Sequence, residues 1–127
     1  DADWQRVYFL GKLPYQSYLA LLQISSVHIY LTYPFVLSWS LLEAMSAGCA
    51  VIASDTPPVA EVIEDGINGR LVPFFDLDAW VSTIDELLEN QSLRADLGVN
   101  ARKTVLSNYD LRTVCVPKQL DWVHSLL

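Results

Sequence analysis

The chain has 127 residues, of which 52% are hydrophobic and 18% are charged, and its formal net charge is −7. This composition describes one globular domain with a core of its own and excludes a disordered chain. The acidic balance argues against nucleic acid or an anionic membrane surface as the main partner, and the longest apolar run is far shorter than the ~20 residues of a membrane span.

Short apolar runs alternate with helical patterns along the first half of the chain. In chain order we expect a buried strand, a helix, a strand, a helix and a strand at residues 7–10, 14–24, 27–31, 38–47 and 50–53. Apolar side chains at helical spacing mark the helices, and β-branched or aromatic runs mark the strands. Ser38 or Ser40 begins the second helix, and Gly48 ends it.

Turn signals and capping residues divide the second half of the chain into one more strand and several helices. A short helix is expected over 59–64 after two prolines, and Asn68-Gly69 predicts a turn before a last strand at 70–72. The remaining helices are expected to begin at Asp76 or Asp78, at Ser92 and at Asp110, with a kink or division at Pro117.

The order of these elements predicts an α/β fold with about four short parallel strands and helices on their faces, a piece of a Rossmann-like, doubly wound sheet. Residues 27–53 supply a strand, a helix, a glycine stop and a strand, which form a right-handed crossover. The N-terminus of that helix then lies at the carboxyl edge of the sheet, where open α/β folds bind ligands. Its free N–H groups and positive dipole end suit a phosphate group.

The run Leu42–Ser54 carries the most specific signal in the sequence. It reads LEAMSAGCAVIAS and resembles the signature LEAMAxGxPVIAS of the group 1 (GT4-like) retaining glycosyltransferases. Phe9-Leu10-Gly11 ahead of it, and Glu61-Val62-Ile63 and 65–72 behind it, fit the same family in the same order. The resemblance extends from about residue 5 to the end of the chain, and several of the family's motifs recur in sequence.

The resemblance implies that residues 1–127 are one partial nucleotide-sugar-binding domain. The family's complete chains have the two-domain GT-B architecture, of which this is the C-terminal half. The resemblance also implies that the first strands of this domain and the whole acceptor-binding domain are absent here, and that the chain alone is inactive. The resemblance further implies that the family's cations for a diphosphate lie in that absent part. Five of the eight basic residues in this chain come late, on helices expected away from the ligand edge: Arg94, Arg102, Lys103, Arg112 and Lys118.

By the same resemblance, the enzyme moves a sugar, of hexosyl type, from a nucleoside diphosphate donor to an acceptor with retention of configuration. Base and ribose anchor the donor, and a helix dipole stabilises the diphosphate leaving group. No metal or other cofactor is expected. The implied partners are a nucleoside diphosphate sugar and an unidentified acceptor, with no nucleic acid, and a peripheral membrane association of the whole enzyme stays open.

Glu43 is the first candidate for a binding role. In the resembling family, the second glutamate of an E-x7-E motif accepts hydrogen bonds from the ribose hydroxyls, and a carboxylate can accept from two vicinal hydroxyls at once. Ser40-Leu41-Leu42-Glu43 also has the pattern of a capping box, in which Glu43 would bond the N–H at the start of the helix. The two roles do not exclude one another.

The first glutamate of that motif has no counterpart in this chain. The position eight residues before Glu43 is Phe35, and phenylalanine can neither accept a hydrogen bond nor stabilise positive charge. In the family this carboxylate lies near the donor sugar, so no catalytic residue is assigned here. A glycine-containing donor-binding loop is replaced by Val36, Leu37, Ser38 and Trp39, which predicts a loop of different shape.

Other candidates flank the predicted strands at the ligand edge. Gly11 and Lys12 follow the first strand, and by resemblance this loop passes near the base of the donor. Thr56 and Glu61 follow the strand that ends at Ser54 and are weaker candidates. A carboxylate at a helix start is the plain structural explanation of Glu61.

The cysteines and histidines predict no metal site and no nucleophile. Cys49 and Cys115 lack ligand-like spacing, and Cys49 stands where a helix-to-strand joint needs a small residue. His28 and His124 have no companion at metal-ligand spacing, so both are expected to be structural. The cysteine usage predicts a reduced, cytoplasmic setting.

Two alternatives stand beside the glycosyltransferase hypothesis. A nucleotide-sugar epimerase or hydrolase would share the architecture and carry its acid and base groups in the missing half. A degenerate relative would bind a nucleotide or a partner without catalysis, which the phenylalanine at position 35 favours.

Overall fold

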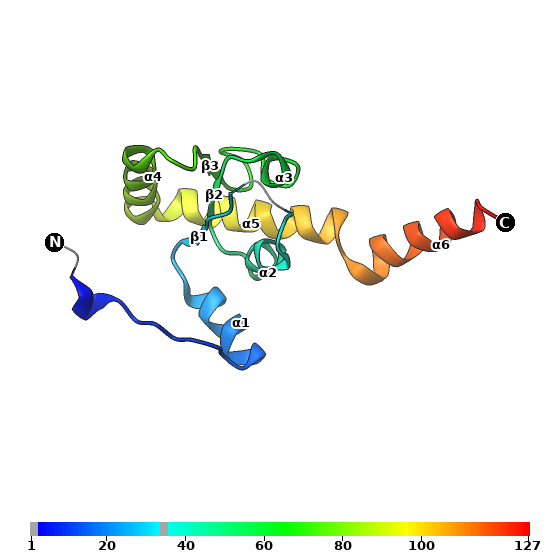
Figure 1. The fold of residues 1–127 in the computed structure, drawn as a ribbon, viewed down its shortest axis with the longest axis horizontal. Coiled ribbons are helices and arrows are strands. Elements are labelled where there is room, and N and C mark those ends of the chain that lie inside the picture. Colours follow the sequence, from blue (N-terminus) through cyan, green and yellow to red (C-terminus); the bar gives the residue numbers. More distant parts are fainter. Residues whose placement is uncertain (1–2, 34–35) are drawn as a thin grey trace.

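A computed structural model describes residues 3–33 and 36–127 (Figure 1). In chain order its elements are η1 (Trp4–Arg6), α1 (Tyr15–Ile24), β1 (His28–Tyr30), α2 (Trp39–Ala47), β2 (Val51–Ser54), α3 (Pro57–Ala60), β3 (Arg70–Val72), α4 (Leu77–Glu89), α5 (Gln91–Asn108), η2 (Leu111–Cys115) and α6 (Val116–His124). Figure 1 shows α2 and α5 against the small sheet, α4 toward one end of the molecule and α6 extending away from the other.

The three strands form a parallel sheet in the order β1-β2-β3. β1 pairs with β2 with Ile29 opposite Ile52, and β2 pairs with β3 with Ala53 opposite Leu71. The predicted strands at 27–31, 50–53 and 70–72 are confirmed, the first two with slightly different ends and the third with the same ends. The parallel order and the flanking helices confirm the predicted Rossmann-like α/β fold.

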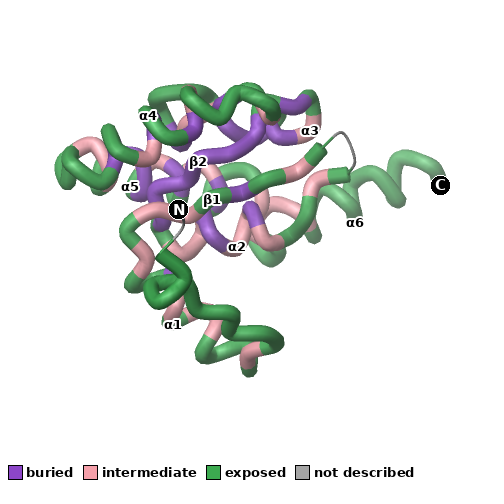
Figure 2. The backbone as a smooth tube through the Cα atoms, turned by 60° about the vertical axis from the view of Figure 1, so that its left-hand side comes forward, coloured by how far each residue is buried: buried purple, intermediate pink, exposed green. Residues whose placement is uncertain are grey.

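β2 lies between two cores, one on each face of the sheet, because successive strand residues point to opposite faces. Val51 and Ala53 belong to the core that α1, α2, α3 and α5 complete. Ile52 belongs to the other core, which contains Trp80 and Leu87 of α4. Every residue of β2 is buried, as Figure 2 shows in purple. A strand covered on both faces explains why this stretch is continuously apolar rather than alternating.

The prediction of a buried strand at Val7–Leu10 is wrong. This run is an irregular segment between η1 and α1, and Phe9 within it is 86% exposed. A strand is stabilised by hydrogen bonds to a neighbouring strand, and apolar side chains alone do not supply them. Within residues 3–33 and 36–127, no strand lies beside this segment, so its side chains stay uncovered.

Several helix starts differ from the expected positions. α3 ends at Ala60 instead of extending over 59–64, because the chain turns at Glu61 and Val62. Asn90, rather than Ser92, caps α5 through its side chain, which accepts from the Leu93 N–H. The predicted division at Pro117 is confirmed, since η2 gives way to α6 at that point.

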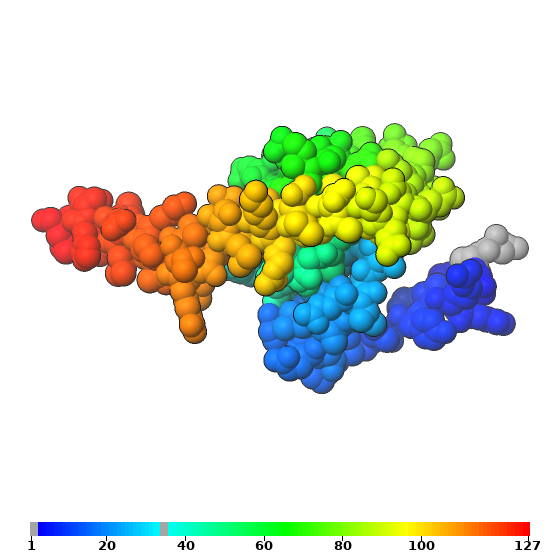
Figure 3. Space-filling model, turned by 180° about the vertical axis from the view of Figure 1, so that it is seen from behind, coloured from blue at the N-terminus to red at the C-terminus, as the bar shows by residue number. Residues whose placement is uncertain are grey.

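α5 crosses the back of the molecule, where Figure 3 shows it from yellow to orange. It packs against the end of α2 through two glycines. Gly48 ends α2 in the left-handed conformation, with φ 82°, and Gly98 of α5 lies against it so closely that a Cβ there would overlap the Gly48 carbonyl oxygen. In the part of the chain that the structure describes, no helix has the length and apolarity needed to cross a membrane.

Candidate functional site

The carboxyl ends of β1 and β2 are joined by a pair of hydrogen bonds. The hydroxyl of Ser54 donates to the Thr32 carbonyl oxygen at 2.7 Å and accepts from the Thr32 N–H at 3.0 Å. Ser54 is buried and Thr32 is half-buried, so both bonds are partly shielded from water. This link fixes where the chain leaves the sheet toward α2, at the edge where the sequence predicts a ligand site.

The N-terminus of α2 begins at this edge and is capped by Ser38. The Ser38 hydroxyl accepts from the Ser40 N–H at 3.3 Å and from the Ser40 hydroxyl at 3.0 Å. The Ser38 N–H donates to the Tyr30 hydroxyl of β1 at 3.0 Å. The predicted start at Ser38 is therefore confirmed, and a buried tyrosine of the sheet holds the loop ahead of it.

A hollow of about 280 Å³ opens beside this N-terminus. Its lining residues are Leu37, Ser38, Trp39, Leu42, Tyr109 and Cys115. Three of the predicted donor-binding residues, the consecutive Leu37, Ser38 and Trp39, thus line one hollow. Trp39 is 81% exposed, whereas Leu37 is half-buried against the core. Tyr109 and Cys115, from the far end of the chain, carry no local sequence signal that points to this place.

Glu43 does not form the predicted capping box. Because Ser38 is the cap, Glu43 falls in the second turn of α2, too far along the helix to bond its first N–H groups. The side chain is half-buried and faces α1 instead. It lines a second hollow, of about 210 Å³, whose walls are Tyr15, Leu19, Gln23, Glu43, Ser46, Ala47 and Arg102.

The electrostatics of this second hollow centre on Glu43. Hydrogen bonding to the Glu43 carboxylate raises the pKa of Tyr15, with desolvation and the negative charge adding to the effect. Burial raises the pKa of Tyr18, and the same carboxylate adds to it. Arg102, which was expected to lie away from the ligand edge with the other late cations, donates to the carbonyl oxygen of Ser46 in the last turn of α2, at the end opposite Ser38.

The remaining candidates lie apart from the two hollows. Gly11 and Lys12 are exposed and precede α1, because the strand expected ahead of them does not form. Glu61 is exposed and stands at the end of α3, so the helix-start explanation for its carboxylate is wrong. Thr56, at the start of α3, is buried, and its hydroxyl has no hydrogen-bond partner among the described residues. Phe35 lies outside the described residues.

The predicted structural roles of Cys49, which is in the core, and of His28, which is half-buried, fit their surroundings. Cys49 is buried, its thiol donates to the Leu22 carbonyl oxygen at 2.9 Å, and burial raises its pKa. Burial lowers the pKa of His28 on β1. Within 3–33 and 36–127, no three His, Cys, Asp or Glu side chains gather as a metal ion would require.

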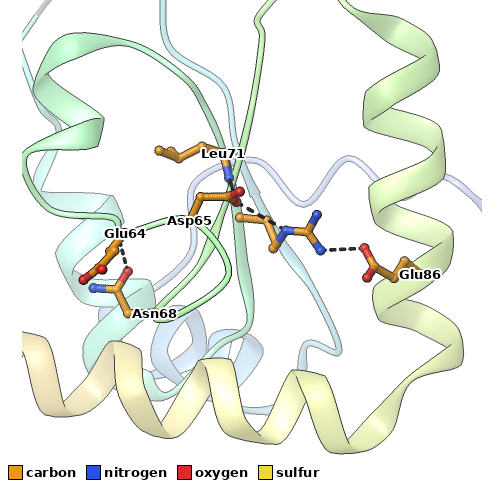
Figure 4. A network of polar contacts seen from close by, with 6 residues as sticks. Glu64, Asp65, Asn68, Leu71 and Glu86 are labelled. Carbon is orange, nitrogen blue, oxygen red and sulfur yellow. Dashed lines mark hydrogen bonds and ion pairs between the residues drawn. The ribbon is translucent and has the colours of Figure 1, made fainter.

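A polar network on the far side of the sheet pairs Arg70 with two carboxylates (Figure 4). Asp65 accepts from the Leu71 N–H at 2.8 Å and pairs with Arg70 at 3.3 Å, and Arg70 pairs with Glu86 of α4 at 2.5 Å. Beside it, the Asn68 side chain accepts from the Glu64 N–H at 2.8 Å. These bonds close the turn before β3 and join it to α4.

The fold and the family model agree on the class of protein. A parallel sheet buried by helices on both faces is a Rossmann-like α/β arrangement. Residues 4–104 match the family model of the glycosyl transferases, group 1. The chain therefore belongs to the group 1 glycosyl transferases.

Proteins related to this chain in sequence are also named as sugar transferases. An uncharacterized glycosyltransferase of Methanocaldococcus jannaschii is 34% identical over 105 residues, which cover 82% of this chain and 27% of that protein. Phosphatidyl-myo-inositol mannosyltransferase of Mycolicibacterium smegmatis is 42% identical over 74 residues, which cover 58% of this chain and 19% of that protein. The chain thus spans about a quarter or less of the length of these relatives.

Solved structures resemble the fold over most of the chain. Sucrose-phosphate synthase from Thermosynechococcus elongatus matches with a TM-score of 0.80 and 25% identity, over 96% of this chain and 31% of that one. HepE of Anabaena, crystallised in complex with UDP, matches with a TM-score of 0.75 and 23% identity, over 84% of this chain and 29% of that one.

Proposed function

We propose that this chain is the donor-binding part of a longer, two-domain glycosyltransferase. The complete enzyme transfers a sugar of hexosyl type from a nucleoside diphosphate donor to an acceptor, with retention of configuration. The observation that carries the proposal is the family's LEAM helix, present here as α2, with its N-terminus at the carboxyl edge of the sheet and Glu43 facing an open hollow. Membership of the group 1 family supports the transferase class.

The proposed donor site extends along α2. The N-terminus at Ser38, Trp39 and Ser40 offers N–H groups and a positive dipole end to the diphosphate, with Leu37 beside them. Glu43, one turn further along, accepts the ribose hydroxyls. Gly11 and Lys12 remain candidates for contact with the base, and Thr56 and Glu61 are weaker ones. No metal or cofactor takes part in this proposal.

The parts of the proposal that concern the complete enzyme rest on the family to which the chain belongs. The acceptor-binding domain and the first strands of this domain belong to the rest of the longer protein, so the chain alone does not turn over a donor. The complete enzyme is proposed to act in the cytoplasm, with or without a peripheral contact to a membrane. The acceptor is a separate molecule that this chain does not bind.

A second candidate function is nucleotide binding without transfer. It is favoured by Phe35, which replaces the family's first glutamate of the E-x7-E motif. Under this alternative the full-length protein binds a nucleoside diphosphate sugar and leaves it intact. Release of the free nucleoside diphosphate from that donor, measured with the full-length protein, decides between the two.

The test of the leading proposal is a thermal-shift series on the full-length protein with UDP, GDP, ADP and TDP. One nucleotide is expected to raise the unfolding midpoint, because a ligand at about 100 times its Kd adds about 2.7 kcal/mol of stability. Glu43→Ala should lose that shift, whereas Glu89→Ala, at the exposed end of α4, should keep it. A cooperative unfolding transition that none of the four nucleotides moves would contradict the proposal.

A further inference from the structure

β1 is an edge strand whose free side carries apolar residues. Within residues 3–33 and 36–127, the sheet has the order β1-β2-β3, so β1 is paired on one side only. The N–H groups of His28 and Thr32 are directed to β2. Because alternate residues of a strand direct their backbone groups to opposite sides, those of Ile29 and Leu31 are directed to the free side. Free backbone groups beside apolar side chains are a template for another strand.

A hollow of about 460 Å³ lies beside β1, on the face of the sheet that α4 covers, and all its lining residues are hydrophobic. Ile29 and Leu31 line it together with Leu77 and Trp80 of α4. Ile29 stands opposite Ile52 of β2, on the same face, yet Ile29 is 44% exposed whereas Ile52 is fully buried. The α4 face is therefore covered over β2 and left open over β1.

The helices that connect the strands show on which side of the sheet the chain enters. α2 joins β1 to β2, α3 joins β2 to β3, and both pack into the core on the face opposite α4. A right-handed crossover places its helix on that face when the chain moves in the direction from β1 to β3. α1 leads into β1 and packs into the same core through Leu22. A strand ahead of α1 must therefore lie on the free side of β1.

The run Val7–Leu10 is the segment ahead of α1, and it does not fill the edge of β1. It has the apolar composition of a strand, yet it pairs with no strand among the described residues. Figure 1 shows the run between η1 and α1, apart from the three strands. The place beside β1 is thus taken neither by this run nor by any other described segment of the chain.

We propose that the segment preceding Val7–Leu10 in the longer protein completes the sheet with a strand and a helix. The strand pairs in parallel with the free side of β1 and supplies the partner that Val7–Leu10 lacks. A crossover from that strand to Val7–Leu10 moves away from β1, so its helix lies on the α4 face and fills the hollow against Ile29 and Leu31. This inference rests on the part of the proposed function that makes the chain a piece of a longer protein, and the chain spans about a quarter of one relative's length.

Hydrogen exchange of the full-length protein tests the strand. The amides of Val7–Leu10 should exchange at least about a hundredfold more slowly than in an unstructured peptide, since a strand inside a sheet opens rarely. Residues 11–13, between the run and α1, are the internal control and should exchange within about tenfold of the unprotected rate. Unprotected amides at Val7–Leu10 in the folded full-length protein would overturn the inference. Protection that disappears when a dimer dissociates on dilution would assign the edge to a second copy and overturn it too.

Two variants of α4 test the helix in the hollow. Leu77 is 76% exposed and lines the hollow, whereas Val81 is 60% exposed and is not among its lining residues. Leu77→Asp should lower the unfolding midpoint of the full-length protein by about 5 °C, because it puts a charge into an apolar contact. An acidic residue in the first turn of α4 is itself favourable, so the helix alone would not cause this loss. Val81→Asp should change the midpoint by less than about 2 °C. Equal shifts of the two variants would overturn the inference.

The results separate this inference from the donor-binding proposal. Unprotected amides at Val7–Leu10, in a protein that a nucleotide still stabilises, would overturn the completed sheet and leave nucleotide binding standing. Protection of Val7–Leu10 together with the effect of Leu77→Asp, in a protein that binds none of the four nucleotides, would support the completed sheet and contradict the donor-binding proposal.

Discussion

Two acidic clusters flank the sheet, and their partners differ. Beside β3, Asp65 and Glu86 share Arg70, and Asp65 also accepts a backbone N–H. Beside α1 and α2, Glu43 faces two phenols and a hollow, with no guanidinium on it among the described residues. A carboxylate that is paired with a guanidinium and a backbone N–H stabilises a turn, whereas one without such partners beside an open space is equipped to bind.

The largest expected effect on the stability of the protein comes from the contact of α5 with the end of α2. Gly98→Ala would place a Cβ on the Gly48 carbonyl oxygen, and neither backbone can yield without moving α2. We expect a loss of about 3 kcal/mol in the free energy of unfolding, measured by urea denaturation. Val99→Ala, at the next and exposed position of α5, is the control and should change stability by less than about 0.5 kcal/mol. A neutral Gly98→Ala would mean that α2 and α5 are not packed as described.

Asn68→Ala is expected to have the next largest effect on stability, and it tests the structural role of the polar network beside β3. It accepts from the Glu64 N–H and donates to the Val62 carbonyl oxygen and the Thr104 hydroxyl, all around a buried side chain. Asn68→Ala leaves these partners unsatisfied, so we expect a loss of about 2 kcal/mol of stability. Nucleotide binding, measured by thermal shift, should stay within twofold. Loss of binding in a folded variant would link this side of the sheet to the donor site.

A crossed pair of variants tests the comparison itself. Asp65→Ala removes the acceptor of the Leu71 N–H and half of the ion-pair network, which should cost about 1 kcal/mol of stability and leave nucleotide affinity unchanged. Glu43→Gln keeps the shape of the side chain and loses its charge. It should weaken nucleotide binding about tenfold while stability changes by less than about 0.5 kcal/mol. Similar effects of the two variants on both measurements would remove the distinction between the clusters.

The smallest expected effect is on the pH dependence of stability, and it comes from His28 on β1. Burial holds the pKa of His28 below its ordinary value, so the unfolded chain takes up the proton at a higher pH than the folded chain does. Stability should therefore fall as the pH drops below about 6.5, the ordinary histidine value. Unfolding midpoints at pH 7.5 and 5.5 measure this drop. His28→Val should reduce it, and His124→Asn, on exposed α6, should not.

Local patterns predicted most of the elements and the central part of the site. The parallel strands, the start of α2 at Ser38 and the helix division at Pro117 all follow from apolar runs, caps and proline chemistry. These features depend on near neighbours in the chain, so a single sequence contains them. The run at Val7–Leu10 shows the limit, because its apolar residues have the composition of a strand and lack the neighbouring strand that would make it one.

The sequence by itself determined the α/β order, the family signature and the presence of Glu43 on its helix. Only the tertiary structure decided where that carboxylate faces. The local pattern offered a capping role for it, whereas the packing of α1 on α2 places it against Tyr15, which is distant in sequence. Arg102 and Tyr109 likewise reach the two hollows from the second half of the chain. Contacts between residues far apart in sequence depend on how whole helices pack on the sheet, and no local spacing encodes them.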